Sequence, residues 1–262
     1  MTNKKIHFIG IGGISMSGIA YIMQSFNATI SGSNIVSNDV TDKLIKDGLN
    51  VLIGHHPEMI SDADIIVYTA AIKEDDPELV KAKKLNKEIY ERAEFLGKLS
   101  QHYKNCLCIA GTHGKSTTTG MVSLIFLEAK LNPTIQIGAM LDEIHGNYYV
   151  GDNNYLIMES CEYKDSFLHF YPTGSIITNI DDDHLDYFKN LQTIKKSFNK
   201  FVNLMPENGI LVKNNDDKNS INVENNYKGT IITYGINNVA NFMAKNIVKN
   251  DKTKDAIEAL QV

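Results

Sequence analysis

The sequence predicts an α/β protein made of two domains that follow one another along the chain. Short apolar runs of strand length alternate with longer segments whose apolar residues recur at helical spacing, a pattern typical of parallel sheets with helical crossovers. Two of these runs, residues 6–11 and 106–110, lead through a glycine-containing turn into an apolar helix. The length of 262 residues suits about two domains of ordinary size. We therefore expect two units, residues 1–103 and 104–262.

The elements of the first domain follow one another in the first third of the chain. A helix expected at residues 14–26 carries its apolar side chains at helical spacing. Ser37 is the expected N-cap of a second helix, and Pro77 opens a third. Strands are expected at residues 6–11, 28–31, 51–53, 65–68 and 88–90. Strands that alternate with helices in this way imply a parallel, Rossmann-like domain.

The second domain begins after an amphipathic segment at residues 91–103. Strands are expected there at residues 106–110, 155–158, 175–178 and 210–212, with a long helix at residues 115–130. Residues 214–228 are polar and rich in Asn, so we expect a surface loop. The tail after residue 249 has little apolar content until residues 256–260. This order of elements predicts a second α/β unit.

Charge and cysteine content exclude several classes of protein. With 26 basic against 31 acidic residues, the net charge is −5, which argues against a broad nucleic-acid-binding surface. The cysteines Cys106, Cys108 and Cys161 are too few, and odd in number, for a disulfide framework. The first apolar run, residues 6–11, is too short for a signal peptide or a membrane span. We expect a cytoplasmic protein with no nucleic-acid partner and no membrane attachment, and we infer no protein partner.

A loop between the strand at residues 106–110 and the following helix has the composition of a phosphate-binding loop. Backbone N–H groups and the macrodipole at a helix start favour an anion, and glycines let the backbone approach it closely. Lys115 can reach the β- and γ-phosphates of ATP, and Ser116 can offer its hydroxyl to Mg²⁺. Ile109 stands where the general P-loop pattern has its first glycine, but the Gly-Lys-Ser core is kept. The expected ATP-binding residues are Gly111, Thr112, His113, Gly114, Lys115, Ser116 and Thr117. The second unit is thus predicted to be a P-loop-type α/β ATP-binding domain.

A second glycine-rich loop, residues 10–18, joins the first strand to the first helix. It departs from the dinucleotide fingerprint, because Ser15 stands in place of the third glycine. No acidic residue follows the second strand until Asp39. A tight loop at a helix N-terminus still suits a diphosphate. The predicted ligand is therefore a nucleotide diphosphate other than NAD, with an NAD-dependent oxidoreductase as the disfavoured alternative.

Acidic residues follow two of the strands expected in the second domain. Glu159 and Glu162 come after residues 155–158, and His184 lies in the acidic run at residues 181–186. Mg²⁺ takes oxygen ligands and keeps several waters, so one or two carboxylates near the phosphates are enough. A helix cap or a solvated face is the alternative interpretation of such residues.

The motifs of this chain resemble, in the same order, those of the Mur ligases of peptidoglycan synthesis. Among these, the alanine-adding UDP-N-acetylmuramate–L-alanine ligases are favoured by His7 and by His113 within the phosphate loop. The matches extend from residue 6 to the neighbourhood of residue 245. They include IHFIGIGG from residue 6, SGS from residue 31, AIKED from residue 71, AGTHGK from residue 110, DSFL from residue 165, TNI from residue 178 and DHLD from residue 183.

The resemblance implies ATP-dependent ligation of L-alanine to UDP-N-acetylmuramic acid. ATP phosphorylates the sugar carboxylate, the amino group attacks the acyl phosphate, and a tetrahedral intermediate collapses to amide, ADP and phosphate. Lys115 and His184 are the implied catalytic residues. Ser116, Glu159 and His184 are the implied metal-binding residues. The implied UDP-sugar site comprises Gly12, Gly13, Ser15, Ser33, His55, Thr69 and Ala70.

The chain departs from the family pattern at several positions. Asn34 and Cys161 stand where the family has Asp, and Ser116 replaces the commoner Thr. The family also has a third domain that closes over ATP and helps to bind the amino acid, and the resemblance does not reach it. We therefore expect a truncated ligase that binds its ligands more readily than it turns over, with a non-catalytic UDP-sugar- and ATP-binding fragment as the alternative.

Overall fold

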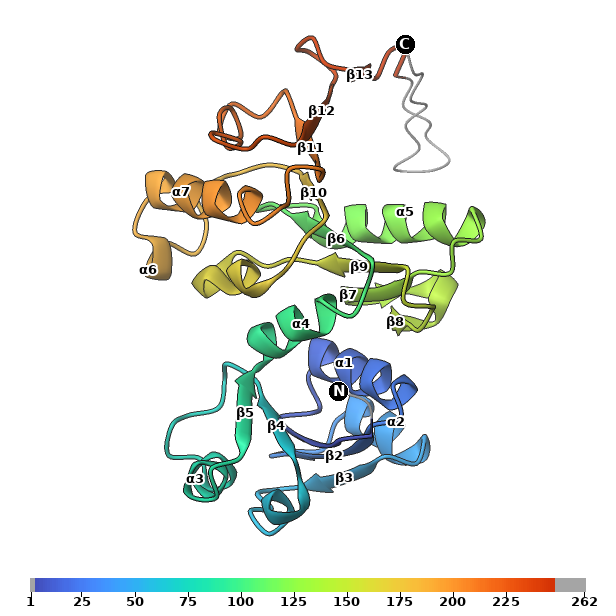
Figure 1. Cartoon of the computed structure of the whole chain (residues 1–262), viewed down its shortest axis with the longest axis vertical. Helices are drawn as coiled ribbons and strands as arrows, with labels where there is room; N and C mark the ends of the chain where they lie inside the picture. Colours follow the sequence, from blue (N-terminus) through green and yellow to red (C-terminus); the bar gives the residue numbers. More distant parts are fainter. Residues whose placement is uncertain (1–2, 248–262) are drawn as a thin grey trace. The chain divides into compact units, whose positions relative to one another are not determined.

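A computed structural model of the chain describes residues 3–247. Its strands form two sheets, one of five strands in the order β3-β2-β1-β4-β5 and one of eight in the order β13-β12-β11-β10-β6-β9-β7-β8 (Figure 1). The predicted α/β class, with mainly parallel sheets, is confirmed. The apolar segment noted at residues 256–260 lies outside the described residues.

The first sheet is parallel throughout, and its order reverses at β1. Its elements are β1 (Lys5–Ile9), α1 (Ile14–Ser25), β2 (Thr29–Asn34), α2 (Asp39–Lys46), β3 (Asn50–Ile53), the 3-10 helix η1 (Met59–Asp62), β4 (Ile65–Tyr68), α3 (Pro77–Lys84), β5 (Glu88–Glu91) and α4 (Arg92–Ser100). β1 pairs with β2 on one side and with β4 on the other. Ligands bind such sheets in the crevice at the carboxyl ends of the strands where the order reverses. The glycine-rich loop after β1 lies at this point.

The N-cap of α2 is Asn38, so the expectation of Ser37 was wrong. The Asn38 side chain accepts a hydrogen bond from the Thr41 N–H at 2.9 Å, and the Thr41 hydroxyl accepts one from the Asn38 N–H at 2.8 Å. These two bonds form a capping box. The Ser37 hydroxyl donates instead to Asp42. Ser and Asn are similarly good N-caps, so their order along the chain could not decide between them.

The second sheet is parallel except at one edge, where β8 runs antiparallel to β7. Its elements are β6 (Asn105–Ala110), α5 (Lys115–Glu128), β7 (Thr134–Leu141), the 3-10 helix η2 (Asp142–Ile144), β8 (Gly146–Tyr149), β9 (Tyr155–Glu159), the 3-10 helix η3 (Tyr163–His169), β10 (Gly174–Ile177), α6 (Leu185–Phe188), α7 (Leu191–Val202), β11 (Ile210–Asn214), β12 (Thr230–Gly235) and β13 (Phe242–Met243). β6 lies between β10 and β9. The carboxyl ends of these three strands carry the phosphate loop and both acidic segments.

Several elements of the second sheet were not expected from the sequence. β7, β8, β12, β13, α6 and α7 are absent from the predicted set. α7 was predictable, since its buried residues Ile194, Phe198 and Phe201 recur at helical spacing. β8 has only four residues, GNYY, and no apolar alternation, so it depends on pairing with β7.

By the density of internal contacts, the chain divides into two compact units. Among the described residues, the first combines residues 3–104 with Gly120–Met158, and the second combines Asn105–Thr119 with residues 159–247. In the first unit the Ile14 carbonyl accepts a hydrogen bond from the Asn147 amide at 2.6 Å, and Tyr21 stacks on Tyr148. In the second, Phe167 packs against Phe198 and Phe201, and all three are fully buried. No helix within residues 3–247 has the length and apolar character needed to cross a membrane.

Candidate functional site

The phosphate loop needs glycine at two positions. Gly111 and Gly114 have φ angles of 141° and 79°, which L-residues rarely adopt. A Cβ at Gly111 would lie 2.0 Å from the Thr178 hydroxyl oxygen. That hydroxyl donates to the His113 carbonyl at 2.7 Å, and the Asn179 side chain accepts from the His113 N–H at 2.9 Å. The segment after β10 therefore holds the loop between β6 and α5 in one conformation.

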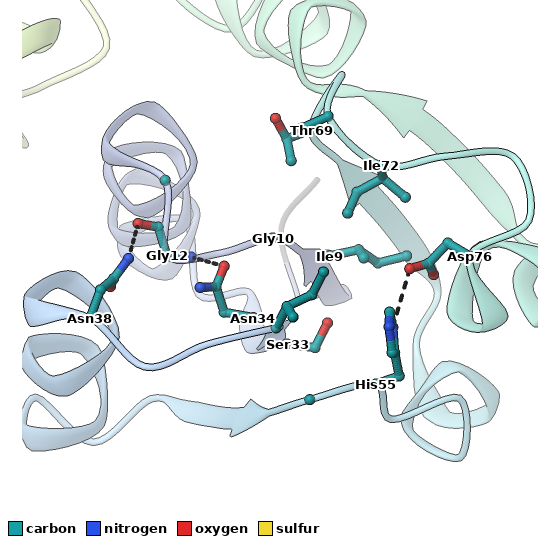
Figure 2. Close-up of a pocket in the computed structure, with 14 residues that line it drawn as sticks. Ile9, Gly10, Gly12, Ser33, Asn34, Asn38, His55, Thr69, Ile72 and Asp76 are labelled. Atoms are coloured by element: carbon teal, nitrogen blue, oxygen red, sulfur yellow. Dashed lines mark hydrogen bonds and ion pairs between the residues drawn. The ribbon is translucent and has the colours of Figure 1, made fainter.

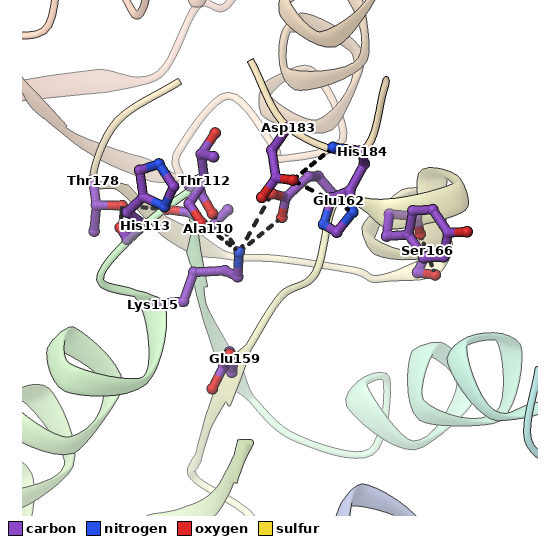
Figure 3. A network of polar contacts seen from close by, with 12 residues as sticks. Ala110, Thr112, His113, Lys115, Glu159, Glu162, Ser166, Thr178, Asp183 and His184 are labelled. Carbon is purple, nitrogen blue, oxygen red and sulfur yellow. Dashed lines mark hydrogen bonds and ion pairs between the residues drawn. The ribbon is translucent and has the colours of Figure 1, made fainter. Parts of the chain in front are cut away.

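Lys115 folds back over this loop. Its ammonium donates to the Gly111 carbonyl at 2.6 Å and to the Thr112 carbonyl at 3.1 Å. It also lies 3.1 Å from the Glu162 carboxylate, and the side chains of Lys115 and Glu162 are only 13% and 2% exposed (Figure 3). An ammonium group beside a phosphate loop can exchange its carboxylate partner for the phosphate of a ligand. Glu162, named as an acidic residue but not as a site residue, thus belongs to this cluster.

Ser116 and Glu159 provide neighbouring oxygen atoms at the start of α5. The Ser116 hydroxyl donates to the Glu159 carboxylate at 2.9 Å. A hydroxyl and a carboxylate beside a phosphate loop fit Mg²⁺, which prefers oxygen ligands and completes its shell with phosphates and water. Within residues 3–247, no three His, Cys, Asp or Glu residues gather closely enough to form a metal cluster of their own. Ser116 and Glu159 would thus supply two of the oxygen ligands of such an ion.

His184 lies at the start of α6 in a left-handed conformation, with φ of 51°. Its ring packs on Tyr163 at 4.6 Å between centroids, and its backbone N–H donates to Asp183 at 2.7 Å. Tyr163 in turn donates to Asp186 at 2.9 Å, and this bond raises the pKa of the Tyr163 hydroxyl. Figure 3 shows His184 and Glu159 at separate positions around Lys115. The structure thus pairs Ser116 with Glu159, whereas His184 contacts Asp183 and Tyr163.

The first unit has a pocket of about 370 Å³ at the reversal point of its sheet (Figure 2). Five of the expected UDP-sugar residues line it, namely Gly12, Gly13, Ser33, His55 and Thr69. Ser15 and Ala70 are not among the lining residues, although the neighbouring Ala71 is. His55 approaches the N-cap of α3 across this pocket, with its Nδ1 3.2 Å from the Asp76 carboxylate.

Asn34 holds the glycine-rich loop. Its side-chain oxygen accepts from the Gly12 N–H at 3.1 Å, and its amide donates to the Val36 carbonyl at 2.7 Å. Asn38 completes the clamp by donating to the Gly12 carbonyl at 3.1 Å. A Cβ at Gly12 would lie 2.7 Å from the Asn34 amide nitrogen, so glycine is needed there. An Asp at position 34 could accept from Gly12 but could not donate to Val36.

Ser15 accepts two hydrogen bonds at the start of α1. Arg92 donates to its hydroxyl oxygen at 3.3 Å, and Gln136 donates at 3.0 Å. The hydroxyl proton of Ser15 is therefore available to an acceptor on a ligand. Arg92, the only arginine in the sequence, was not predicted as a site residue. Gln136 could not have been connected to Ser15 by any local pattern, since it lies 121 residues away.

Family models match most of the chain. A family model described as the Mur ligase family, catalytic domain, matches residues 5–104, and one described as the Mur ligase middle domain matches residues 109–262. UDP-N-acetylmuramate–L-alanine ligases of Clostridium perfringens and Clostridium botulinum are 47% and 50% identical to the chain over 250 residues, which are 95% of this chain and 54% of each relative. The chain thus spans about half the length of the curated relatives it matches.

A solved structure shows the same relationship. The UDP-N-acetylmuramate-alanine ligase of Thermotoga maritima superposes with a TM-score of 0.80 and 30% identity, over 92% of this chain and 54% of that one. The family models, the sequence identity and the shared fold all relate this chain to Mur ligases over most of its length. This chain belongs to the Mur ligase family.

Proposed function

We propose that the chain carries the nucleotide-sugar and ATP sites of a ligase that joins L-alanine to UDP-N-acetylmuramic acid. The observation that carries the proposal is the arrangement at the start of α5, where the Lys115 ammonium lies over the phosphate loop and the Ser116 hydroxyl contacts Glu159 at 2.9 Å. This arrangement suits ATP with Mg²⁺. The substrates are proposed from the relatives, which are named UDP-N-acetylmuramate–L-alanine ligases.

The proposal divides the work between two domains. Residues 1–103 would bind the UDP-sugar in the pocket at the end of β1, and residues 104–262 would bind ATP. The pocket has the dimensions of a small-molecule site, and its glycine-rich loop lies at a helix N-terminus that favours a diphosphate. We place the reaction in the cytoplasm, where UDP-activated precursors and ATP are both available.

Phosphoryl transfer to the sugar carboxylate requires positioned positive charge, because the transition state spreads negative charge over the phosphoryl oxygens. Lys115 would exchange Glu162 for the β- and γ-phosphates of ATP. Ser116 and Glu159 would hold Mg²⁺, which supplies further neutralising charge when bound, and His184 is proposed to complete this side of the site. The amino group of L-alanine would then attack the acyl phosphate, giving amide and phosphate.

An assay of ADP release by the 262-residue chain tests the proposal. ADP release that requires both UDP-N-acetylmuramic acid and L-alanine would support a ligase. Binding of the UDP-sugar and ATP without release would support the alternative of a non-catalytic binding fragment. Failure to bind either ligand would contradict both functions. Membership of the Mur ligase family leaves the NAD-dependent alternative without support.

A further inference from the structure

A fully buried carboxylate lies one hydrogen bond away from the pocket of Figure 2. Glu78, near the start of α3, has no exposed surface. Its Oε2 accepts from the hydroxyl of the pocket residue Ser33 at 2.6 Å and lies 3.4 Å from Nε2 of the buried His7. Its Oε1 accepts from the backbone N–H of His56 at 2.5 Å. One carboxylate thus connects residues that follow or belong to β1, β2 and β3.

The contact between Glu78 and Ser33 determines which way the Ser33 hydroxyl can act. A serine hydroxyl has one proton to donate and two lone pairs that accept. Burial raises the pKa of Glu78, but the hydrogen bonds from His7, Ser33 and His56 outweigh it, so the pKa is lowered and the group is an ionised acceptor. The proton of Ser33 is therefore committed to Glu78. Toward the pocket, Ser33 presents only lone pairs.

In other nucleotide-binding sheets, the end of the second strand also supplies a hydrogen-bond acceptor, but there the acceptor is an acidic side chain. In dinucleotide-binding domains an acidic residue at the end of the second strand accepts a hydrogen bond from the ribose hydroxyl. Here β2 ends at Ser33 and Asn34, and the side chain of Asn34 is already bonded to Gly12 and Val36. Ser33 with Glu78 behind it supplies the missing acceptor at this position.

We propose that Glu78 is a positioning residue that makes Ser33 an obligate hydrogen-bond acceptor, so that the pocket recognises a ribose hydroxyl of its nucleotide ligand. The ribose is the part of a nucleotide next to the diphosphate, and the glycine-rich loop proposed to hold the diphosphate lines the same pocket as Ser33. This inference rests on the proposed UDP-sugar site, and it adds how that site selects a ribonucleotide.

The substitution Glu78→Gln reverses the direction of this hydrogen bond without changing the size of the side chain. The His56 backbone N–H can only donate, so the amide oxygen of the glutamine takes the place of Oε1. The amide NH₂ then takes the place of Oε2. Ser33 can rotate to accept from it, and His7 can accept through its other tautomer. The network stays satisfied, but the proton of Ser33 now points into the pocket.

Calorimetry with UDP, 2′-deoxy-UDP, 3′-deoxy-UDP and the matching fluoro-deoxy analogues tests the proposal on the 262-residue chain. The wild-type protein is expected to prefer UDP over one deoxy analogue by about tenfold, the effect of one hydrogen bond to a buried acceptor. Ser33→Ala is expected to remove this preference. Glu78→Gln is expected to keep it, because a ribose hydroxyl can also accept from the reversed Ser33, but to narrow the gap between UDP and its fluoro-deoxy analogue, whose fluorine can accept and cannot donate. Glu74→Gln is the matched control, because its carboxylate is 83% exposed and paired with Lys83, and it should keep both the preference and the gap.

The outcomes separate this inference from the function on which it rests. If wild-type protein binds no UDP, the proposed UDP-sugar site is wrong. If it binds UDP but Ser33→Ala keeps the ribose preference, Ser33 is not the acceptor and the inference is overturned. If Glu78→Gln weakens all these ligands equally at an unchanged melting temperature, Glu78 only supports the loop, which also overturns it.

Discussion

The ammonium of Lys115 lies 3.1 Å from the carboxylate of Glu162, and neither side chain is more than 13% exposed. Lys115 thus lies over the phosphate loop with Glu162 as its anionic partner. At the proposed ATP site, phosphates replace Glu162 as the partner of this cation, so Glu162 competes with the nucleotide.

Glu162→Gln should consequently lose stability and gain affinity. Leaving Lys115 without its buried partner should cost about 1–3 kcal/mol of unfolding free energy, which lowers the melting temperature by about 2–4 °C per kcal/mol. Without Mg²⁺, ADP should bind several-fold more tightly, because a competing negative charge has been removed. Thermal melts and calorimetry in EDTA measure both effects. Glu128→Gln, an exposed change at the end of α5, is the control, and weaker ADP binding by Glu162→Gln would contradict the account.

The two loop glycines should differ in their tolerance of alanine. Both have positive φ, and the angle of 141° at Gly111 is harder for an L-residue to adopt than the 79° at Gly114. At Gly111 a Cβ would also collide with the Thr178 hydroxyl, whereas at Gly114 no atom lies within 4 Å. Gly111→Ala should therefore abolish ADP binding, and Gly114→Ala should weaken it less. Equal loss of ADP affinity in both variants would show that neither the collision with Thr178 nor the larger φ at position 111 limits the loop.

Arg92→Lys should weaken UDP-sugar binding although the charge is kept. The guanidinium reaches the Ser15 hydroxyl and offers several donors in a fixed plane, which an ammonium cannot reproduce. We expect a loss of about tenfold in the affinity for UDP-N-acetylmuramic acid, measured by calorimetry. ADP binding should not change, and this serves as the folding control. Full affinity in Arg92→Lys would show that the contact of Arg92 with Ser15 does not support UDP-sugar binding.

Glu78 should also make stability depend on pH in the acid range. Its pKa in the folded chain is lowered from the ordinary 4.5, so its contribution is complete above 4.5 and is lost as pH falls through the folded value. The difference in unfolding free energy between wild type and Glu78→Gln should therefore shrink as pH falls below 4.5. Urea unfolding from pH 7 to pH 3 measures it. A difference that grows on acidification would mean that the pKa of Glu78 is raised.

Local sequence was sufficient to predict the two strand–helix junctions that carry the glycine-containing loops. Each combines an apolar run, glycines and an apolar helix within 25 residues, and the structure places β1–α1 (Lys5 to Ser25) and β6–α5 (Asn105 to Glu128) at these positions. The family assignment followed from the same motifs and is confirmed. β8 and the very short β13 were not predicted, because such edge strands depend on their partners more than on their own composition.

Long-range side-chain contacts could not be read from the sequence. Glu78 lies 45 residues from Ser33, and Glu162 lies 47 residues from Lys115. No periodicity relates residues at such distances, so the supporting carboxylates were missed or left unassigned. Ser116 and Glu159, both named from the sequence, do meet. The metal role of His184 stays a prediction.

The UDP-sugar site and the ATP site proposed for this chain bind their ligands independently of each other. Titration of UDP-N-acetylmuramic acid into wild-type and Lys115→Ala protein tests this independence. We expect equal affinity for the UDP-sugar in both proteins, while Lys115→Ala no longer distinguishes ATP from ADP. Loss of UDP-sugar binding together with ATP binding in Lys115→Ala would contradict the independence of the two sites.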